Sequence, residues 1–208
     1  MDNCVFCNTE AVKDSIYQTQ NFYVRVGIGL IAPGHVLIIP KEHYKCFAEL
    51  PEHLEPELGE LKRELQQTVT EKFAAPFLIE YGVWGQTVNH AHIQVVPSRS
   101  EDYEIESLIQ EMVVPGGIRH EARDMRGLKE VLEKEQWYVS IEEKGTLYVC
   151  HIDGIDYDDI EHSKHLRYRR FFELTKGLKG LGSWTDMSDE HKEADGRNRD
   201  LTRRLLTG

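Results

Sequence analysis

The chain has 208 residues, 40% of them hydrophobic and 29% charged, which suits one large globular domain or an ordinary domain with an appendage. The formal net charge of −11 argues against a long groove that follows a polyanion such as extended nucleic acid, because such grooves need clustered Lys and Arg. No segment reads as a transmembrane helix or a secretory signal, so we expect a cytoplasmic protein that does not contact membranes.

The first motif is the Cys-x-x-Cys spacing of Cys4 and Cys7. It could be a redox pair, two ordinary buried thiols or half of a zinc site. The redox interpretation expects a strand before the motif, and the chain has no room for one there. A zinc site needs two further ligands, for which His43 and His90 are the candidates. The alternative is that His43 belongs to a solvated turn and that His90 orients a catalytic residue without a metal.

Strands are predicted at residues 21–26 and 35–40, with Pro33 and Gly34 in the turn between them. A long helix is predicted over residues 51–75. Its apolar side chains recur at spacings of three and four and form one stripe for packing against a sheet, made of Leu54, Leu58, Leu61, Leu65, Val69 and Phe73. A further strand is predicted at residues 77–81.

Within residues 85–97, polar side chains recur at every second position from His90 to Gln94. If this segment is a strand, His90, His92 and Gln94 project to one side while Ala91, Ile93 and Val95 project to the other. One side then belongs to a core and the other to a functional site. The alternative is a half-buried strand with a solvated polar side, but such positions are usually Thr, Lys, Glu or Ser.

A boundary is predicted at residues 113–117, which contain a Pro-Gly-Gly sequence, and it divides the chain into domains 1–112 and 113–208. A helix is expected at 125–136, a hairpin from 137–141 and 146–150, and helices near 165–178 and 189–206. One basic patch stands out, which is either a solvated helix face or a second phosphate contact: Arg167, Arg169, Arg170, His162 and His165.

The segment 85–97, together with residues 34–40 upstream, resembles the signature blocks of the histidine triad (HIT) superfamily. Gln94 stands where most members have a third His. That substitution is typical of the branch with galactose-1-phosphate uridylyltransferases, dinucleoside polyphosphate phosphorylases and CwfJ-like proteins. The resemblance implies an α+β fold, a HIT-like antiparallel sheet with a packed helix, followed here by a smaller C-terminal α+β extension. It covers roughly the first half of the chain.

The same resemblance assigns roles to individual residues. It implies that His92 is the nucleophile and that Gln94 and His90 complete the catalytic group. By analogy with the uridylyltransferases it implies a structural zinc ion. The candidate zinc ligands are Cys4, Cys7, His43 and His90, and the candidate substrate-binding residues are Gly85, Gln86, Thr87, Arg25 and Glu80.

One departure concerns Gly27, which stands where dinucleotide-hydrolysing relatives have an acidic or amide residue for the ribose. The expected function is nucleotidyl transfer, or hydrolysis or phosphorolysis of a phosphoanhydride, through a covalent His92–nucleotide intermediate. The expected substrate is a nucleotide, nucleotide-sugar or dinucleotide. The alternative is a CwfJ-like module that binds a nucleotide or RNA end without turnover. Many relatives form homodimers, although nothing in this sequence fixes the oligomeric state.

Overall fold

A computed structural model describes residues 4–83, 86, 88–98, 118–122, 125–135, 138–151 and 187–208. Its centre is one eight-stranded sheet in the order β1-β2-β3-β5-β4-β7-β8-β6, and every pairing between these described strands is antiparallel. The strands are β1 Tyr17–Gln18, β2 Phe22–Val26, β3 Val36–Pro40, β4 Pro76–Gly82, β5 Ile93–Pro97, β6 Ile118–Ala122, β7 Tyr138–Glu143 and β8 Thr146–His151.

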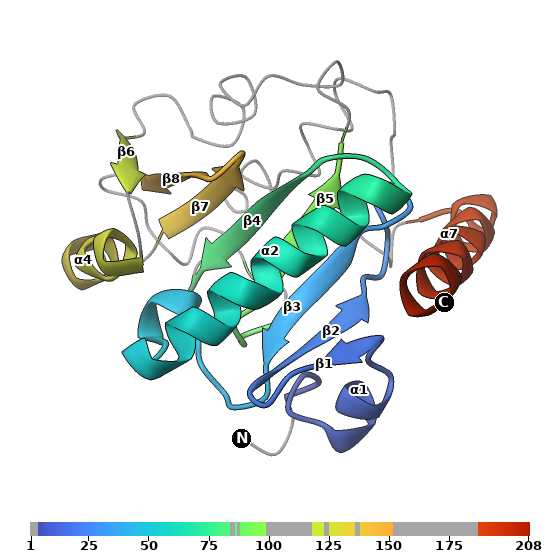
Figure 1. Ribbon diagram of the computed structural model, residues 1–208, viewed down its shortest axis with the longest axis horizontal. Helices are drawn as coiled ribbons and strands as arrows, with labels where there is room; N and C mark the ends of the chain where they lie inside the picture. The colour runs from blue at the N-terminus through green and yellow to red at the C-terminus, as the bar shows by residue number, and fades with distance from the viewer. Residues whose placement is uncertain are drawn as a thin grey trace.

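Helices complete the α+β fold that the sequence predicts (Figure 1). Helix α2 crosses one face of the sheet, α1 lies next to β1, α4 lies near β6–β8, and α7 lies beside the turn between β2 and β3. Their bounds are α1 Thr9–Lys13, α2 Glu55–Lys72, α4 Met125–Glu135 and α7 Asp189–Thr207, with short 3-10 turns η1 Phe47–Glu49 and η2 Glu52–Leu54. Among the described residues, no helix is long and apolar enough to cross a membrane.

Helix α2 buries the predicted apolar stripe, but it is shorter than the predicted range 51–75. Pro51 precedes the 3-10 turn η2, and the α-helix itself begins at Glu55, with Pro56 in its first turn, where the missing N–H breaks no helical bond. Four side chains of the stripe are buried in the α-helix against the inner face of the sheet: Leu58, Leu61, Leu65 and Val69.

The central segment differs from the prediction in where the strand begins. Strand β5 starts only at Ile93, because the backbone before it bonds elsewhere: the His90 N–H donates to the Val88 carbonyl (2.8 Å), and the Ala91 N–H donates to the Tyr44 carbonyl (2.7 Å). The alternation of sides nevertheless holds. Ala91, like Ile93, lies in the core cluster under α2, whereas the His90 ring contacts Phe6 on the other face.

The second half of the chain extends the same sheet, because β7 pairs with β4 over five residue pairs. The structure confirms the predicted helix at 125–136, the predicted hairpin and the last predicted helix as α4, β7–β8 and α7. Strand β6 was not predicted, since its centre reads Arg-His-Glu. The predicted helix 165–178, the basic patch and the boundary at 112–113 lie outside the described residues, so the division into two domains stays a prediction.

Candidate functional site

His92 is the residue whose protonation the structure fixes most directly. Its Nδ1 lies 2.8 Å from the carbonyl oxygen of His90. A carbonyl can only accept, so Nδ1 carries the proton in the neutral ring, and Nε2 holds an unshared electron pair. The side chain is 7% exposed, and its ring packs edge-on against Phe6 with centroids 5.4 Å apart. An oriented neutral imidazole of this kind can act as a nucleophile.

Gln94 is oriented by a residue that sequence reasoning missed. His35 accepts a hydrogen bond at Nδ1 from the Ile31 N–H (3.4 Å), so its Nε2 is the protonated nitrogen and donates to Gln94 Oε1 (3.2 Å). The carboxamide therefore turns its oxygen toward His35 and its NH₂ group away. Residue 35 was predicted only as part of a strand. The available signal was its polar side chain two residues before Leu37, which pairs with Gln94 across the sheet.

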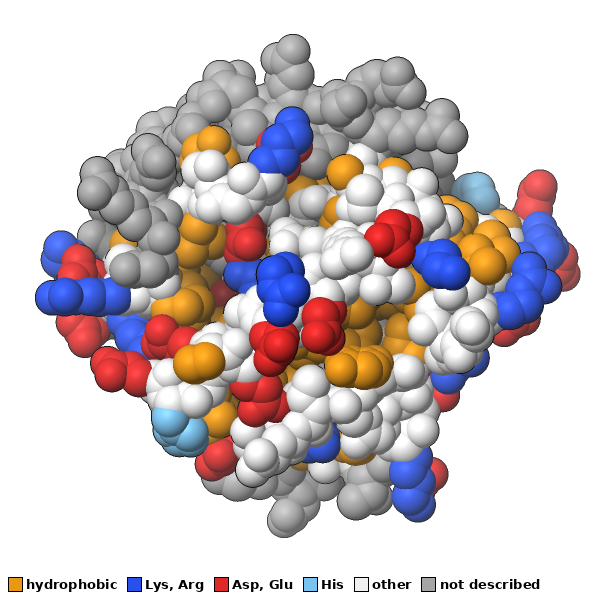
Figure 2. Space-filling view, in the orientation of Figure 1, with side chains coloured by type: hydrophobic (Ala, Val, Ile, Leu, Met, Phe, Trp, Pro, Cys, Tyr) orange, Lys and Arg blue, Asp and Glu red, His pale blue; other side chains and the backbone are white. Residues whose placement is uncertain are grey.

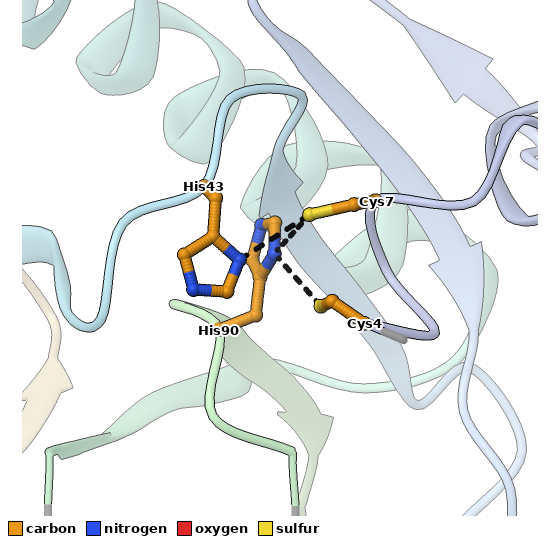
Figure 3. A group of neighbouring side chains, drawn as sticks. All are labelled: Cys4, Cys7, His43 and His90. Atoms are coloured by element: carbon orange, nitrogen blue, oxygen red, sulfur yellow. Dashed lines mark hydrogen bonds between the residues drawn. The ribbon is translucent and has the colours of Figure 1, made fainter. Parts of the chain in front are cut away.

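A second group of side chains could hold a metal ion. The ligand atoms of Cys4, Cys7, His43 and His90 all lie within 4.8 Å of one another. Figure 3 shows them converging from three segments: the N-terminal turn, the loop after β3 and the segment before β5. These are the four residues proposed as ligands from the sequence, and the structure brings all of them together.

The distances within this metal group suit tetrahedral coordination. His90 Nδ1 lies 3.4 Å from Cys4 Sγ and 3.4 Å from Cys7 Sγ, and His43 Nδ1 lies 3.3 Å from Cys7 Sγ. Ideal zinc bonds to sulfur and nitrogen at tetrahedral angles separate two such ligand atoms by roughly 3.6 Å. A set of two thiols and two imidazoles with these separations fits a zinc ion.

The protonation states of the side chains in the metal group also favour binding of a cation. The His90 Nε2–H donates to the Pro40 carbonyl (2.9 Å), which leaves Nδ1 unprotonated and directed at the two sulfurs. Burial lowers the pKa of His90 to about 4, so its ring is neutral at physiological pH. Burial, reinforced by Cys4, raises the pKa of Cys7 to about 11. A bound cation would deprotonate the thiol, because metal ligation favours the thiolate.

Local structure explains why the N-terminal turn presents its sulfurs in this direction. The Cys7 N–H donates to the Cys4 carbonyl (3.2 Å), which closes the turn, and Asn8 caps helix α1 immediately afterwards. The buried Tyr23 hydroxyl on β2 donates to the Phe6 carbonyl (2.8 Å) between the two cysteines. The turn is thus attached to the same face of the sheet that carries His92 and Gln94.

The proposed substrate-binding residues are dispersed. The Arg25 side chain shares the face of Gln94, since both positions pair with Leu37, and its guanidinium bonds Asp14 Oδ2 at 3.3 Å. Glu80 pairs with Ser140 and follows Leu78, which lies in the core under α2, so it projects from the opposite face. The structure therefore does not bring Glu80 to His92 and Gln94.

The side chain of Gln86 is hydrogen-bonded to the backbone of the protein itself. Its amide nitrogen donates to the carbonyls of Lys45 (2.8 Å) and Tyr81 (2.6 Å), so both amide hydrogens already have backbone acceptors. Its oxygen Oε1 is buried and has no hydrogen-bond partner. In this arrangement Gln86, a candidate substrate-binding residue, offers an acceptor rather than a donor to a phosphate. Gly85 and Thr87 lie outside the described residues.

Helix α7 holds the turn between β2 and β3, which no sequence pattern predicted. The buried Asp195 carboxylate accepts from the N–H groups of Gly29 (3.2 Å) and Leu30 (2.6 Å), and the Thr202 hydroxyl accepts from the Gly34 N–H (2.8 Å). Gly34 has φ +92°, a conformation that favours glycine, and an added Cβ would lie 2.6 Å from the Phe73 ring. The C-terminal helix thereby fixes the loop next to His35.

Comparison with known proteins places this fold and site in a family. The family model described as "HIT domain" matches residues 8–101. An uncharacterized HIT-like protein of Saccharolobus solfataricus is 31% identical over 109 residues, which cover 49% of this chain and 78% of that protein. The chain therefore belongs to the HIT domain family.

Two further proteins are similar to about half of the chain. A bis(5'-nucleosyl)-tetraphosphatase (asymmetrical) of Schizosaccharomyces pombe is 31% identical over 97 residues, 45% of this chain and 53% of that enzyme. A solved structure of a HIT family hydrolase from Clostridium thermocellum is 30% identical, with 50% of this chain and 98% of that chain covered and a TM-score of 0.42. Both likenesses are confined to about half of this chain.

Proposed function

We propose that this protein is a nucleotidyl transferase, or a hydrolase or phosphorylase of nucleotide phosphoanhydrides, and that His92 forms a covalent intermediate with the nucleotide. The observation that carries the proposal is the 2.8 Å hydrogen bond from His92 Nδ1–H to the His90 carbonyl, which leaves Nε2 as the nucleophile. The 31% identity to a bis(5'-nucleosyl)-tetraphosphatase, over 45% of this chain and 53% of that enzyme, supports a nucleotide as the substrate class.

The first chemical step is substitution at the α-phosphorus. His92 Nε2 attacks phosphorus, the P–N bond forms, and the P–O bond to the leaving group breaks with its electron pair on that oxygen. The charge that develops on the ring is stabilised by the bond from Nδ1–H to the His90 carbonyl. In the second step an oxygen of water or of another phosphate attacks phosphorus, and the P–N bond breaks with its electron pair returning to His92 Nε2. An attacking water gives up its proton to the solvent.

Gln94 limits the leaving groups that this site can handle. A histidine in its place could bind phosphate and also give a proton to the leaving group, whereas a carboxamide can only hydrogen-bond. Because its oxygen already accepts from His35, its NH₂ group is the part that would donate to a phosphate oxygen. This favours good leaving groups, such as a nucleotide or a sugar phosphate. We therefore propose that the protein belongs to the Gln-containing branch of the family and that its substrates are dinucleotides or nucleotide-sugars.

We also propose that the metal group of Cys4, Cys7, His43 and His90 holds a structural zinc ion. The support is the tetrahedral spacing of two thiols and two imidazoles. When bound, the ion would cross-link the N-terminal turn to the loop after β3 and to the segment before β5. His90 would then have two tasks: its ring would hold the metal and its carbonyl would orient His92.

In the experiment the protein is mixed with a dinucleoside polyphosphate, a nucleoside-diphosphate sugar or a nucleoside phosphoramidate. The reaction is quenched in denaturant, and the mass of the intact protein is measured by mass spectrometry. We expect a mass increase of one nucleotidyl group with at least one of them, absent in His92→Ala. His53→Ala is the matched control, because His53 is an exposed residue of η2. If each nucleotide binds for hours without any adduct, the proposal fails in favour of a CwfJ-like module that binds without turnover.

A further inference from the structure

We infer that Tyr138, a residue of the second half of the chain, positions the nucleophile His92 through Glu80 and the loop after β3. The inference rests on the proposed role of His92. Tyr138 lies on β7, outside the residues 8–101 that match the family model, and it belongs to the cluster next to α4. The connection runs from one face of the sheet to the other through four hydrogen bonds and one peptide unit, and the bond from His92 Nδ1 to the His90 carbonyl completes it.

The first two bonds involve the carboxylate of Glu80, which is 2% exposed. Its Oε1 accepts from the Phe47 N–H (2.7 Å), and its Oε2 accepts from the Tyr138 hydroxyl (2.7 Å). Glu80 therefore connects the first residue of the η1 turn to strand β7.

The third bond involves the Tyr138 hydroxyl, which also accepts from the Ala48 N–H (3.2 Å). The ring itself is fully buried. It lies over Gly82, its partner across the sheet, where an added Cβ would come within 2.4 Å of the ring. Glycine at 82 thus makes room for the tyrosine. Together Glu80 and Tyr138 bond two successive backbone N–H groups of the η1 turn.

The fourth bond reaches the nucleophile through one peptide unit. Three residues before Phe47, the Tyr44 carbonyl accepts from the Ala91 N–H at 2.7 Å. The same peptide unit contains the His90 carbonyl, which accepts from His92 Nδ1. Because a peptide unit is planar, the direction of its N–H fixes the direction of its C=O. The loop that Glu80 and Tyr138 hold therefore sets the orientation of the carbonyl that fixes the His92 tautomer.

The chemistry of this network points to positioning rather than to stability alone. Burial raises the pKa of Glu80 to about 7, so the folded protein keeps its charged form at a cost in free energy. An apolar pair of similar volume would fill the same space without that cost. Directional hydrogen bonds, however, fix the angle of the backbone at Phe47 and Ala48, which packing alone does not.

The test compares Tyr138→Phe with the unchanged protein in the presence of an adduct-forming nucleotide. The variant keeps the ring and loses only the hydroxyl. We expect the rate constant for nucleotidyl-His92 formation to fall about tenfold while the half-saturating nucleotide concentration stays unchanged, since small displacements of a reacting group cost rate. We also expect faster hydrogen exchange of the Ala91 amide, measured by NMR on protein with ¹⁵N-labelled alanine.

Two further variants separate positioning from loss of stability. Leu128→Ala removes a buried side chain from the same cluster as Tyr138 without removing a hydrogen bond, so it should lower the unfolding temperature and leave rate and Ala91 exchange unchanged. Glu80→Gln keeps an acceptor for Phe47 and a polar group for the tyrosine hydroxyl, so it should retain most of the rate, whereas Glu80→Ala should not.

The inference is overturned if Tyr138→Phe forms the adduct at the original rate and protects the Ala91 amide as before. It is also overturned if Leu128→Ala, at equal loss of unfolding temperature, slows the adduct step as much. Should the unchanged protein form no adduct, the proposed function fails. The Ala91 exchange rates would then still decide whether Tyr138 holds the peptide unit before His92.

Discussion

Two loops at opposite ends of β3 carry groups next to the candidate site, and they are held in different ways. The loop after β3 contains His43 of the metal group, and its backbone bonds to the Glu80–Tyr138 pair. The turn before β3 is held from α7, where the Asp195 carboxylate and the Thr202 hydroxyl accept hydrogen bonds from its N–H groups. The loop after β3, the first loop, bonds the peptide unit that orients His92, so we expect changes there to alter the chemical step. The turn before β3, the second loop, lies next to His35 and its partner Gln94, so we expect changes there to alter binding.

Figure 2 shows the face of the molecule that α2 crosses, which is the face opposite to Gln94. On the face crossed by α2, Lys and Arg side chains are scattered among Asp and Glu side chains rather than gathered into a band. The described residues of this face therefore form no basic band of the kind that binds a polyanion.

The largest effect should follow loss of the metal from the first loop. We expect Cys7→Ser, or treatment with a strong chelator, to lower the free energy of unfolding by about 4 kcal/mol, the amount that a tightly bound ligand adds at a large excess over its Kd. Zinc content by elemental analysis and thermal unfolding with and without chelator measure this. Cys46→Ala is the matched control, since Cys46 is a buried cysteine outside the metal group. Retention of one zinc ion per chain in Cys7→Ser would contradict the metal proposal.

The next effect is the pH dependence of the first loop through Glu80. Burial raises its pKa to about 7 in the folded protein, above the value of an exposed glutamate near 4.5. The folded state therefore binds more protons than the unfolded state between these values, and the contribution of Glu80 to stability is lost as pH rises from about 4.5 to about 7.

The shift corresponds to a change of about 3 kcal/mol in that contribution. Glu80→Gln removes this titration and leaves the other groups in place. Urea unfolding at several pH values should show the stability of the unchanged protein falling relative to Glu80→Gln over this range, then running parallel above pH 7. Parallel curves across the whole range would mean that Glu80 does not titrate with a raised pKa.

The smallest effect on stability should come from the second loop. Asp195→Ala removes the acceptor for the Gly29 and Leu30 N–H groups, which we expect to cost about 2 kcal/mol. Because this turn leads into His35, which orients Gln94, we expect the KM for nucleotide to rise about tenfold while kcat changes little. Steady-state kinetics separates the two parameters.

Arg203→Ala provides the control on the same helix. Its ion pair with Asp14 is 2.9 Å long but partly solvent-exposed on both sides, so its loss should change stability by less than about 1 kcal/mol and leave KM as it was. A fall in kcat, rather than a rise in KM, in Asp195→Ala would contradict the expectation that the turn before β3 affects binding and not the chemical step.

Much of this arrangement could be predicted from the sequence because its signals are local. The period of two places Ala91 and Ile93 in the core, and the period near 3.6 defines the buried stripe of α2. The metal group joins segments far apart in the chain: His43 and His90 were candidates from the sequence, and the family resemblance assigned them as ligands together with the two cysteines.

The remaining features depend on contacts that no local pattern contains. Glu80 and Tyr138 form a hydrogen bond although they are 58 residues apart in the sequence, and Asp195 and Leu30 do so at a separation of 165 residues. Glu80 also shows a missed signal: it stands two residues after the buried Leu78, so a strict period of two places it on the core face and away from Gln94. The role of His35 similarly required the pairing of β3 with β5.

The tautomer of His92 is the property on which the account depends most. It can be measured directly from the ¹⁵N chemical shifts of the His92 ring, in protein labelled at histidine and assigned with His92→Ala. We expect Nδ1 to be protonated and Nε2 to be unprotonated at neutral pH, as the bond to the His90 carbonyl requires. A ring with its proton on Nε2 would have no free electron pair facing a phosphorus atom, and it would contradict the proposed nucleophile.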